Sequence, residues 1–131
     1  MKFSFILWVL GKKLSSKSKK DPSFKTHVKE KNFKLLIKTE DGKRARSYTF
    51  SDGDVISQKG DAPDAAVTLV WADASIAAAT MTSKDPNASM TALQEGKLKI
   101  EGDAGLALWF TGTVKLLTGK AQEEQKENAQ G

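Results

Sequence analysis

The sequence lacks cysteine altogether and has a single histidine among its 131 residues. The absence of cysteine excludes disulfide bonds and thiolate metal sites, and is consistent with a reducing, cytoplasmic location. The one histidine leaves no second imidazole for a zinc site, and the sequence contains no acidic calcium-loop, nucleophile-elbow or phosphate-loop motif. We therefore expect no metal, no cofactor and no enzymatic activity.

The single histidine, His27, lies among Lys25, Lys29 and Lys31 in a stretch that we expect to form an exposed helix. A catalytic base needs a partner within hydrogen-bonding reach, and the sequence gives no means of proposing one. We interpret His27 as a surface residue.

The sequence also lacks a hydrophobic run long enough to cross a bilayer. The longest apolar stretch near the N-terminus, residues 3–10, falls well short of the ~20 residues that a membrane span needs. No small-residue cleavage site follows it, which disfavours a cleaved signal peptide. We expect a cytoplasmic protein that could associate with membranes.

Positive charge is concentrated in the first third of the chain. Residues 1–46 contain 14 Lys and Arg against 4 Asp and Glu, whereas residues 47–131 contain 7 against 12. A basic segment on an acidic body favours an anionic surface, either nucleic acid or lipid. Because Phe33, Tyr48 and Phe50 alternate in register with aliphatic residues, we expect them in the core rather than stacked on bases, and we predict no nucleic-acid binding.

Hydrophobic periodicity predicts an α+β fold in one domain. Apolar residues recur at helical spacing over 2–20, and Asp21-Pro22 marks the start of a short second helix to about residue 31. From Asn32 the period changes to two, with Asp-Gly turns separating three strands of a meander. The remaining expected elements are a strand at 65–71, helices begun by Asp73 and at 88–94, a strand at 97–101, and a helix from Asp103 to about Thr118.

The predicted helices and strands divide the chain into three parts. Residues 1–31 form a basic amphipathic helical arm, 32–118 form the folded domain, and 119–131 form a polar tail without large apolar residues that we expect to be disordered.

The last predicted helix is unusually apolar. Between Asp103 and Thr118 the only other charge is Lys115, and apolar residues occupy more than half of the circumference. Such a helix is expected to be buried on two sides or to line a cavity. A core helix is the default interpretation of an apolar stripe, and a wall around a hydrophobic ligand is the alternative.

Two stretches of the sequence favour a wall around a ligand. GKLKIEGDAGLAL at 96–108 and DAAVTLVWADA at 64–74, with the element order from about Asn32 to Leu117, resemble the sterol carrier protein type 2 family of small lipid-binding domains. The resemblance implies a five-stranded mixed, mostly antiparallel sheet with helices packed on one face, enclosing an apolar tunnel. It also implies non-enzymatic binding or transfer of a lipid such as a fatty acid, a fatty acyl-CoA or a sterol-like molecule.

The resemblance also indicates which residues would line such a tunnel. Trp109 and Phe110 stand where the family often has polar or smaller residues, so they could fill the tunnel or reshape its mouth. The expected apolar lining is Val67, Leu69, Ile76, Met90, Leu98, Ile100, Leu106, Leu108, Trp109, Phe110 and Val114. A second hypothesis is a ligand-free module of the same fold that presents its apolar helix to a partner protein, such as an enzyme of lipid or quinone metabolism.

The N-terminal arm joins an apolar stripe to a lysine cluster, which is typical of a helix lying in a membrane interface. The arm could equally dock onto its own domain or close a homodimer. The residues expected to contact an anionic membrane are Phe3, Ile6, Leu7, Leu10, Lys12 and Lys13.

Overall fold

The computed structural model describes residues 2–83, 85 and 87–118, and the predicted polar tail at 119–131 lies outside them. The described elements, in chain order, are α1 (Lys2–Lys20), α2 (Pro22–Lys29), β1 (Phe33–Thr39), β2 (Ala45–Ser51), β3 (Asp54–Lys59), β4 (Val67–Trp71), α3 (Ala74–Met81), α4 (Ala88–Gln94), β5 (Leu98–Gly102) and α5 (Ala104–Thr118). The α+β prediction is confirmed, and the expected elements are found with small differences at their ends.

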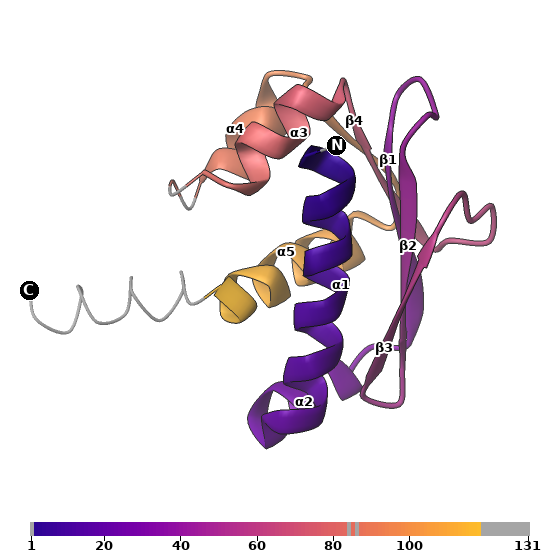
Figure 1. Cartoon of the computed structure of the whole chain (residues 1–131), viewed down its shortest axis with the longest axis vertical. Coiled ribbons are helices and arrows are strands. Elements are labelled where there is room, and N and C mark those ends of the chain that lie inside the picture. The colour runs from indigo at the N-terminus through magenta and orange to yellow at the C-terminus, as the bar shows by residue number, and fades with distance from the viewer. Residues whose placement is uncertain (1, 84, 86, 119–131) are drawn as a thin grey trace, which may run out of the picture.

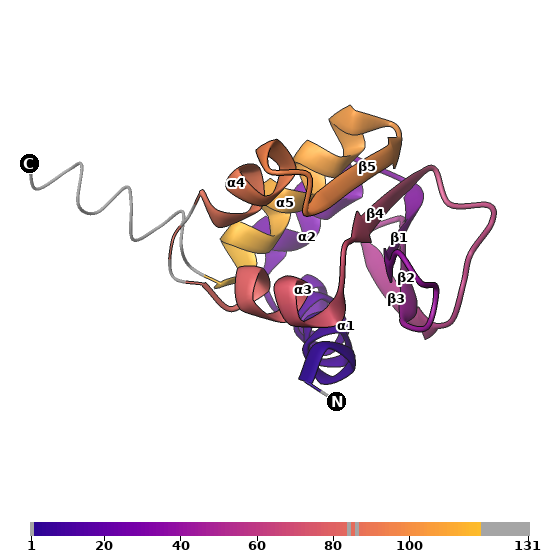
Figure 2. The same ribbon diagram turned by 90° about the horizontal axis from the view of Figure 1, so that it is seen from above.

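The five strands form one mixed sheet in the order β3-β2-β1-β4-β5. β1 pairs in parallel with β4, and the other three pairs are antiparallel. All five helices lie on one face of this sheet, as the two views in Figures 1 and 2 show together. α1 and α2 contact the β2–β3 side, whereas α3, α4 and α5 contact β4 and β5. The sheet and helices therefore form two layers with the core between them.

Local side-chain chemistry starts three of the helices where the sequence predicts. The Asp21 side chain accepts hydrogen bonds from the backbone N–H groups of Ser23 and Phe24, with Pro22 at the first helical position. Asp73 and Asp103 cap α3 and α5 in the same way, through the N–H groups of Ile76 and Leu106. These caps satisfy donors that the first turn of a helix leaves unpaired.

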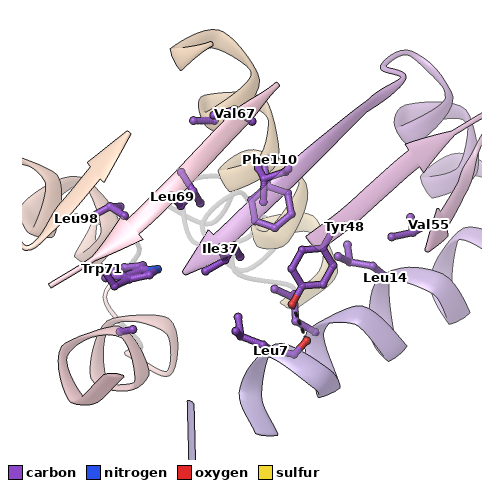
Figure 3. Packing of buried hydrophobic residues seen from close by; sticks show 14 of the residues in the cluster. Leu7, Leu14, Ile37, Tyr48, Val55, Val67, Leu69, Trp71, Leu98 and Phe110 are labelled. Carbon is purple, nitrogen blue, oxygen red and sulfur yellow. Dashed lines mark hydrogen bonds between the residues drawn. The ribbon is translucent and has the colours of Figure 1, made fainter. Parts of the chain in front are cut away.

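The helix α1 is part of the core. Its inward stripe consists of Phe3, Leu7, Leu10 and Leu14, each no more than 7% exposed. These side chains belong to the same hydrophobic cluster as the inner residues of the sheet (Figure 3). Burying each of them contributes ~1.5–3 kcal/mol, so docking on its own sheet outweighs exposure to water. The helices of residues 1–31 thus share one core with residues 32–118.

This packing corrects the expectation for three membrane-contact residues. Phe3, Leu7 and Leu10 face the sheet and cannot reach a bilayer while α1 is docked. The apolar side chains that α1 presents to solvent are Phe5, which is 62% exposed, and Trp8, which is 46% exposed. None of the helices within the described ranges is long and apolar enough to cross a membrane.

Within the described part of the chain no helix lies on the opposite face of the sheet, yet Leu36 on β1 and Val70 on β4 are buried there. The loop that follows β3 returns along this face, and Lys34 Nζ donates to Asp64 Oδ2 at 2.9 Å. Ala62 in the same loop is also buried. Leu36 interrupts the alternation of apolar and polar residues along β1. It does so because it packs in this second, smaller apolar layer.

Candidate functional site

A cavity of about 290 Å³ lies between the helices and the inner face of the sheet. Its floor is formed by Ile37, Leu69, Trp71 and Leu98 from three neighbouring strands. Its walls come from α1, from α3 to α4, and from α5, and they comprise Phe5, Ile6, Val9, Leu10, Lys13, Thr80, Met81, Thr82, Asp85, Ala88, Ser89, Phe110, Thr111 and Val114. The cavity is therefore predominantly apolar, and α1 and α5, the first and last helices of the described chain, both contribute to its walls.

Sheet register explains which strand residues reach the floor. Leu69 and Trp71 are two residues apart on β4 and therefore share its inner face. Trp71 is opposite Leu98 on β5. Ile37 is opposite Leu69 across the parallel pair. Period-two alternation turns all four toward the helices.

Four of the eleven residues expected to line a lipid site do line the cavity: Leu69, Leu98, Phe110 and Val114. Phe110 is 3% exposed and also contacts the rings of Tyr48 and Phe50, so it contributes to the wall without filling the space.

The remaining seven lie elsewhere. Val67 is buried in the core, and Ile76, Ile100 and Leu106 pack against it half-buried. Met90 and Leu108 are exposed, at 46% and 57%. The exposure of Leu108 means that α5 turns part of its apolar surface to solvent, whereas the sequence indicated burial on two sides or a cavity wall.

Trp109 points away from the cavity, toward α2 and the far end of the sheet. Its ring stacks on His27 at 5.1 Å between centroids and 7° between planes, and it meets Phe33 and Phe50 edge-on. His27 Nε2 also lies 2.8 Å from Thr113 Oγ1. The interpretation of His27 as a plain surface residue is wrong, because its half-buried ring joins α2 to α5.

The Thr113 hydroxyl is shared between the two helices. Its oxygen lies 2.8 Å from the carbonyl oxygen of Trp109 and 2.8 Å from Nε2 of His27, and its one hydrogen can be donated to either of them. In both cases His27 has a structural role between α2 and α5.

Sequence reasoning missed the contribution of α1 to the cavity. Ile6, Leu10 and Lys13 were expected to contact a membrane, and Phe5 and Val9 were assigned no role. Phe5, Val9 and Lys13 follow one another at four-residue spacing in a second stripe beside the buried one. The helical periodicity of α1 was the available signal, since a helix with apolar residues on two adjacent stripes can touch both a sheet and a cavity.

The polar groups around the cavity are few. Lys13 and Asp85 are its charged lining residues, and three threonine hydroxyls donate to helix carbonyls: Thr80 to Ile76, Thr82 to Ala78 and Thr111 to Ala107. Within the described ranges no three His, Cys, Asp or Glu side chains are grouped to hold a metal ion. The arrangement suits the uptake of a hydrophobic molecule.

Comparison with solved structures finds the same fold. A UbiJ-SCP2 ubiquinone synthesis protein superposes with a TM-score of 0.64 at 20% identity, over 86% of this chain and 88% of the other. Sterol carrier protein 2 from Yarrowia lipolytica, in its apo form, gives 0.57 at 21% identity, over 84% and 87%. A conserved hypothetical protein from Thermus thermophilus gives 0.55 at 12% identity, over 88% and 85%.

Comparison with curated protein sequences finds no significant match. A family model does match, and it spans most of the chain: the SCP-2 sterol transfer family, over residues 10–115. Since the match covers much of α1, the whole sheet and most of α5, the chain belongs to the SCP-2 sterol transfer family.

Proposed function

We propose that this protein binds a hydrophobic lipid in the cavity between the sheet and helices α1, α3, α4 and α5, without catalysis. The observation that carries the proposal is the apolar cavity of about 290 Å³, which the large side chains of Phe110 and Trp71 border and leave open. Membership of the SCP-2 sterol transfer family supports lipid binding or transfer in general.

The size of the cavity favours a single acyl chain. Small-molecule pockets typically measure ~300–1,000 Å³, so about 290 Å³ is at the lower limit. Each methylene moved from water into this space contributes ~0.8 kcal/mol. A fatty acid or fatty acyl group satisfies both conditions, and a bulky head such as that of an acyl-CoA would remain outside.

The test compares two alanine-to-phenylalanine variants. Ala88 lines the cavity on α4, whereas Ala79 is exposed on α3. Ala88→Phe is expected to place a ring in the cavity and to weaken binding of a fluorescent fatty acid at least tenfold. Ala79→Phe is the matched control and should bind like the wild type. Equal binding by both variants, or protein that takes up no fatty acid and carries no lipid in native mass spectrometry, would contradict the proposal.

We also propose that the outer face of α1 docks on an anionic membrane and so delivers the lipid. Phe5 and Trp8 are exposed on this face, and Lys12 Nζ lies 5.6 Å from the Trp8 ring centroid. A shallow groove along the same face is lined by Trp8, Val9, Lys12, Lys13, Ser16, Lys17 and Lys20. Aromatic rings together with lysines match the interface of an anionic bilayer.

The position of this face supports its coupling to the cavity. Phe5, Val9 and Lys13 line the cavity, and Val9 and Lys13 also line the outer groove. A lipid leaving a bilayer beneath α1 would thus meet the mouth of the cavity directly. The exchange would take place at a cytoplasmic membrane surface.

Vesicle sedimentation tests the docking face. Vesicles of phosphatidylcholine with and without phosphatidylglycerol distinguish charge from apolar insertion. The double variant Phe5→Ser and Trp8→Ser should lose binding to the anionic vesicles, whereas Ile56→Ser, at an exposed apolar residue of β3, should retain it. If the double variant still binds the anionic vesicles, the proposal that the outer face of α1 docks on a membrane is refuted.

A second candidate function is a protein-interaction module that presents α5 to a partner. The exposure of Leu108 on α5 favours it, because a large aliphatic side chain that is 57% exposed on an already apolar helix suits a protein contact. One structural relative is described as a ubiquinone synthesis protein, so a partner enzyme of quinone metabolism fits this reading. Lipid-free protein in native mass spectrometry would favour this candidate over the carrier.

A further inference from the structure

A polar pocket lies between α1 and the outer strands of the sheet, apart from the lipid cavity. Its volume is about 210 Å³, and it is lined by Trp8, Gly11, Lys12, Ser15, Arg46, Val55 and Ser57. None of these residues lines the cavity, and none of them carries a carboxylate. The pocket is therefore a separate site, in which the positive charges of Lys12 and Arg46 are not offset by an acidic side chain.

Sheet register and the path of α1 bring these residues together. Arg46 precedes Tyr48 by two residues on β2, and Ser57 is opposite Tyr48 on β3, so both share the inner face of the sheet with the buried tyrosine. Gly11 lies against Ser57, where a Cβ would be 2.6 Å from Ser57 Oγ, and this close approach brings Lys12 to the same space. The pocket is thus formed where α1 passes over β2 and β3.

Arg46 is half-buried, and it forms no ion pair with an acid among the described residues. Its Nη1 donates to Ser57 Oγ at 2.6 Å, which is a bond to a neutral hydroxyl. A charged group that loses part of its hydration is normally compensated by an opposite charge. A guanidinium has five N–H donors, so Arg46 retains several for a ligand.

The polar pocket beside the loop after β3 has the opposite composition. Its two lysines, Lys34 and Lys59, share the space with Asp61 and Asp64, and Lys34 Nζ lies 2.9 Å from Asp64 Oδ2. The carboxylates of the protein therefore neutralise that pocket. In the pocket beside α1, a compensating anion has to come from outside the described part of the chain.

We propose that the pocket beside α1 binds the phosphate group of a phosphate monoester, with Arg46 as its bidentate partner and Lys12 as the second cation. A monoester carries a charge of about −1.5 to −2 at neutral pH, which matches the two positive charges. The planar guanidinium fits two phosphate oxygens, and the Ser57 hydroxyl, whose oxygen accepts from Arg46, has its own hydrogen to donate to a third. A carboxylate or a phosphodiester carries a single charge and is expected to bind less tightly.

Two sources supply this chemistry, the head group of phosphatidic acid and a soluble ester such as glycerol 3-phosphate. Trp8 and Lys12 line both this pocket and the outer groove of α1. The site is therefore accessible from the side on which we propose that α1 docks on a membrane.

Titration of the wild type with inorganic phosphate and with glycerol 3-phosphate, at constant ionic strength, tests the site in solution. In ¹H–¹⁵N NMR spectra, the Arg46 Nε–H and Ser57 amide resonances should shift saturably with both compounds. Acetate should need at least a tenfold higher concentration for the same shift, because it carries one charge. An absence of saturable shifts with both phosphate compounds would overturn the inference.

The two arginines of the chain provide a matched pair of variants. Arg46→Gln is expected to weaken binding of glycerol 3-phosphate at least tenfold, because it removes the charge and the two-pronged donor together. Arg44→Gln removes the same charge outside the pocket and should bind like the wild type. Equal weakening by the two variants would show a non-specific effect of charge and overturn the inference. The wild-type titration decides the matter if Arg46→Gln folds poorly.

Vesicles distinguish the two sources of the phosphate group. Phosphatidylcholine vesicles that contain phosphatidic acid or phosphatidylglycerol are adjusted to equal surface charge. If the source is a lipid, Arg46→Gln should lose binding to the phosphatidic acid vesicles only. If the source is soluble, the wild type and Arg46→Gln should bind both kinds of vesicle equally, and glycerol 3-phosphate should bind the wild type. Because the pocket shares no residue with the cavity, fatty-acid binding is tested independently of this site.

Discussion

The hydroxyl of Tyr48 on β2 donates a hydrogen bond to the backbone carbonyl of Leu7 on α1, with 2.6 Å between the oxygens (Figure 3). Both residues are essentially inaccessible to solvent, at 0% and 1%. This bond ties the N-terminal helix to the middle of the sheet, next to the wall of the cavity. It also shows that α1 docks with a polar contact in addition to its apolar stripe.

Removing this hydroxyl should destabilise the fold without changing its shape. Tyr48→Phe leaves the ring in place and removes the donor, so we expect the free energy of unfolding to fall by about 1–2 kcal/mol. Urea denaturation followed by circular dichroism measures the change. An unaltered midpoint and slope would show that the bond contributes nothing to stability.

Tyr48 should also make the protein sensitive to alkali. Burial raises the pKa of Tyr48 above its ordinary value of 10.0. Because the folded state disfavours the charged phenolate, the contribution of this group is intact below pH ~10 and is lost as the pH rises further. Tyr48 is the one tyrosine of the chain, so the difference between the wild type and Tyr48→Phe in thermal unfolding from pH 8 to 11 isolates it. The two curves should converge at the alkaline end, and parallel curves would contradict this.

Replacing Gly11 by alanine should destabilise the protein, although a glycine-to-alanine change stabilises most helices. A Cβ at Gly11 on α1 would lie 2.6 Å from Ser57 Oγ and 2.7 Å from Ser57 Cβ on β3. Gly11→Ala is therefore expected to destabilise by about 1–3 kcal/mol through overpacking. Gly112→Ala on α5 is the matched control, since nothing lies within 4 Å of its Cβ, and it should stabilise by up to ~1 kcal/mol. Changes of the same sign in both variants would show that α1 does not lie this close to β3.

His27 and Thr113 should be energetically coupled. A double-mutant cycle of His27→Ala and Thr113→Val is expected to give an interaction energy of about 0.5–1.5 kcal/mol, because either change breaks the same hydrogen bond. The control cycle combines His27→Ala with Thr111→Val, because the Thr111 hydroxyl donates to the Ala107 carbonyl within α5. That cycle should give a value near zero, and equal values in the two cycles would argue against a specific contact.

The sequence predicted the elements of the fold well, because each has a local cause. Asp21, Asp73 and Asp103 stand at the starts of helices and cap them, and the Asp-Gly turns lie between the strands of the meander. Family resemblance then supplied the mixed five-stranded sheet, whose parallel pairing of β1 with β4 no local pattern specifies.

The candidate site was predicted only in part, because it depends on contacts between distant residues. His27 and Thr113 are 86 positions apart, and the stacking of His27 on Trp109 removes Trp109 from the cavity. Periodicity showed that α1 has an apolar face but not what covers it. A cavity is space that side chains leave unfilled, so its lining follows from packing and not from the apolar character of single residues.

The walls of the cavity come from the earliest and the latest parts of the described chain, α1 and α5, with the sheet between them. A nascent chain that has emerged only as far as β4 has the residues to pack α1 against β1, β2 and β3. It still leaves the apolar side chains of Leu69 and Trp71 uncovered by α5. The cavity has its full wall only after α5 has packed, because Phe110, Thr111 and Val114 are on that helix. Until then a partially synthesised chain leaves apolar surface exposed, which makes it prone to aggregation and in need of chaperones.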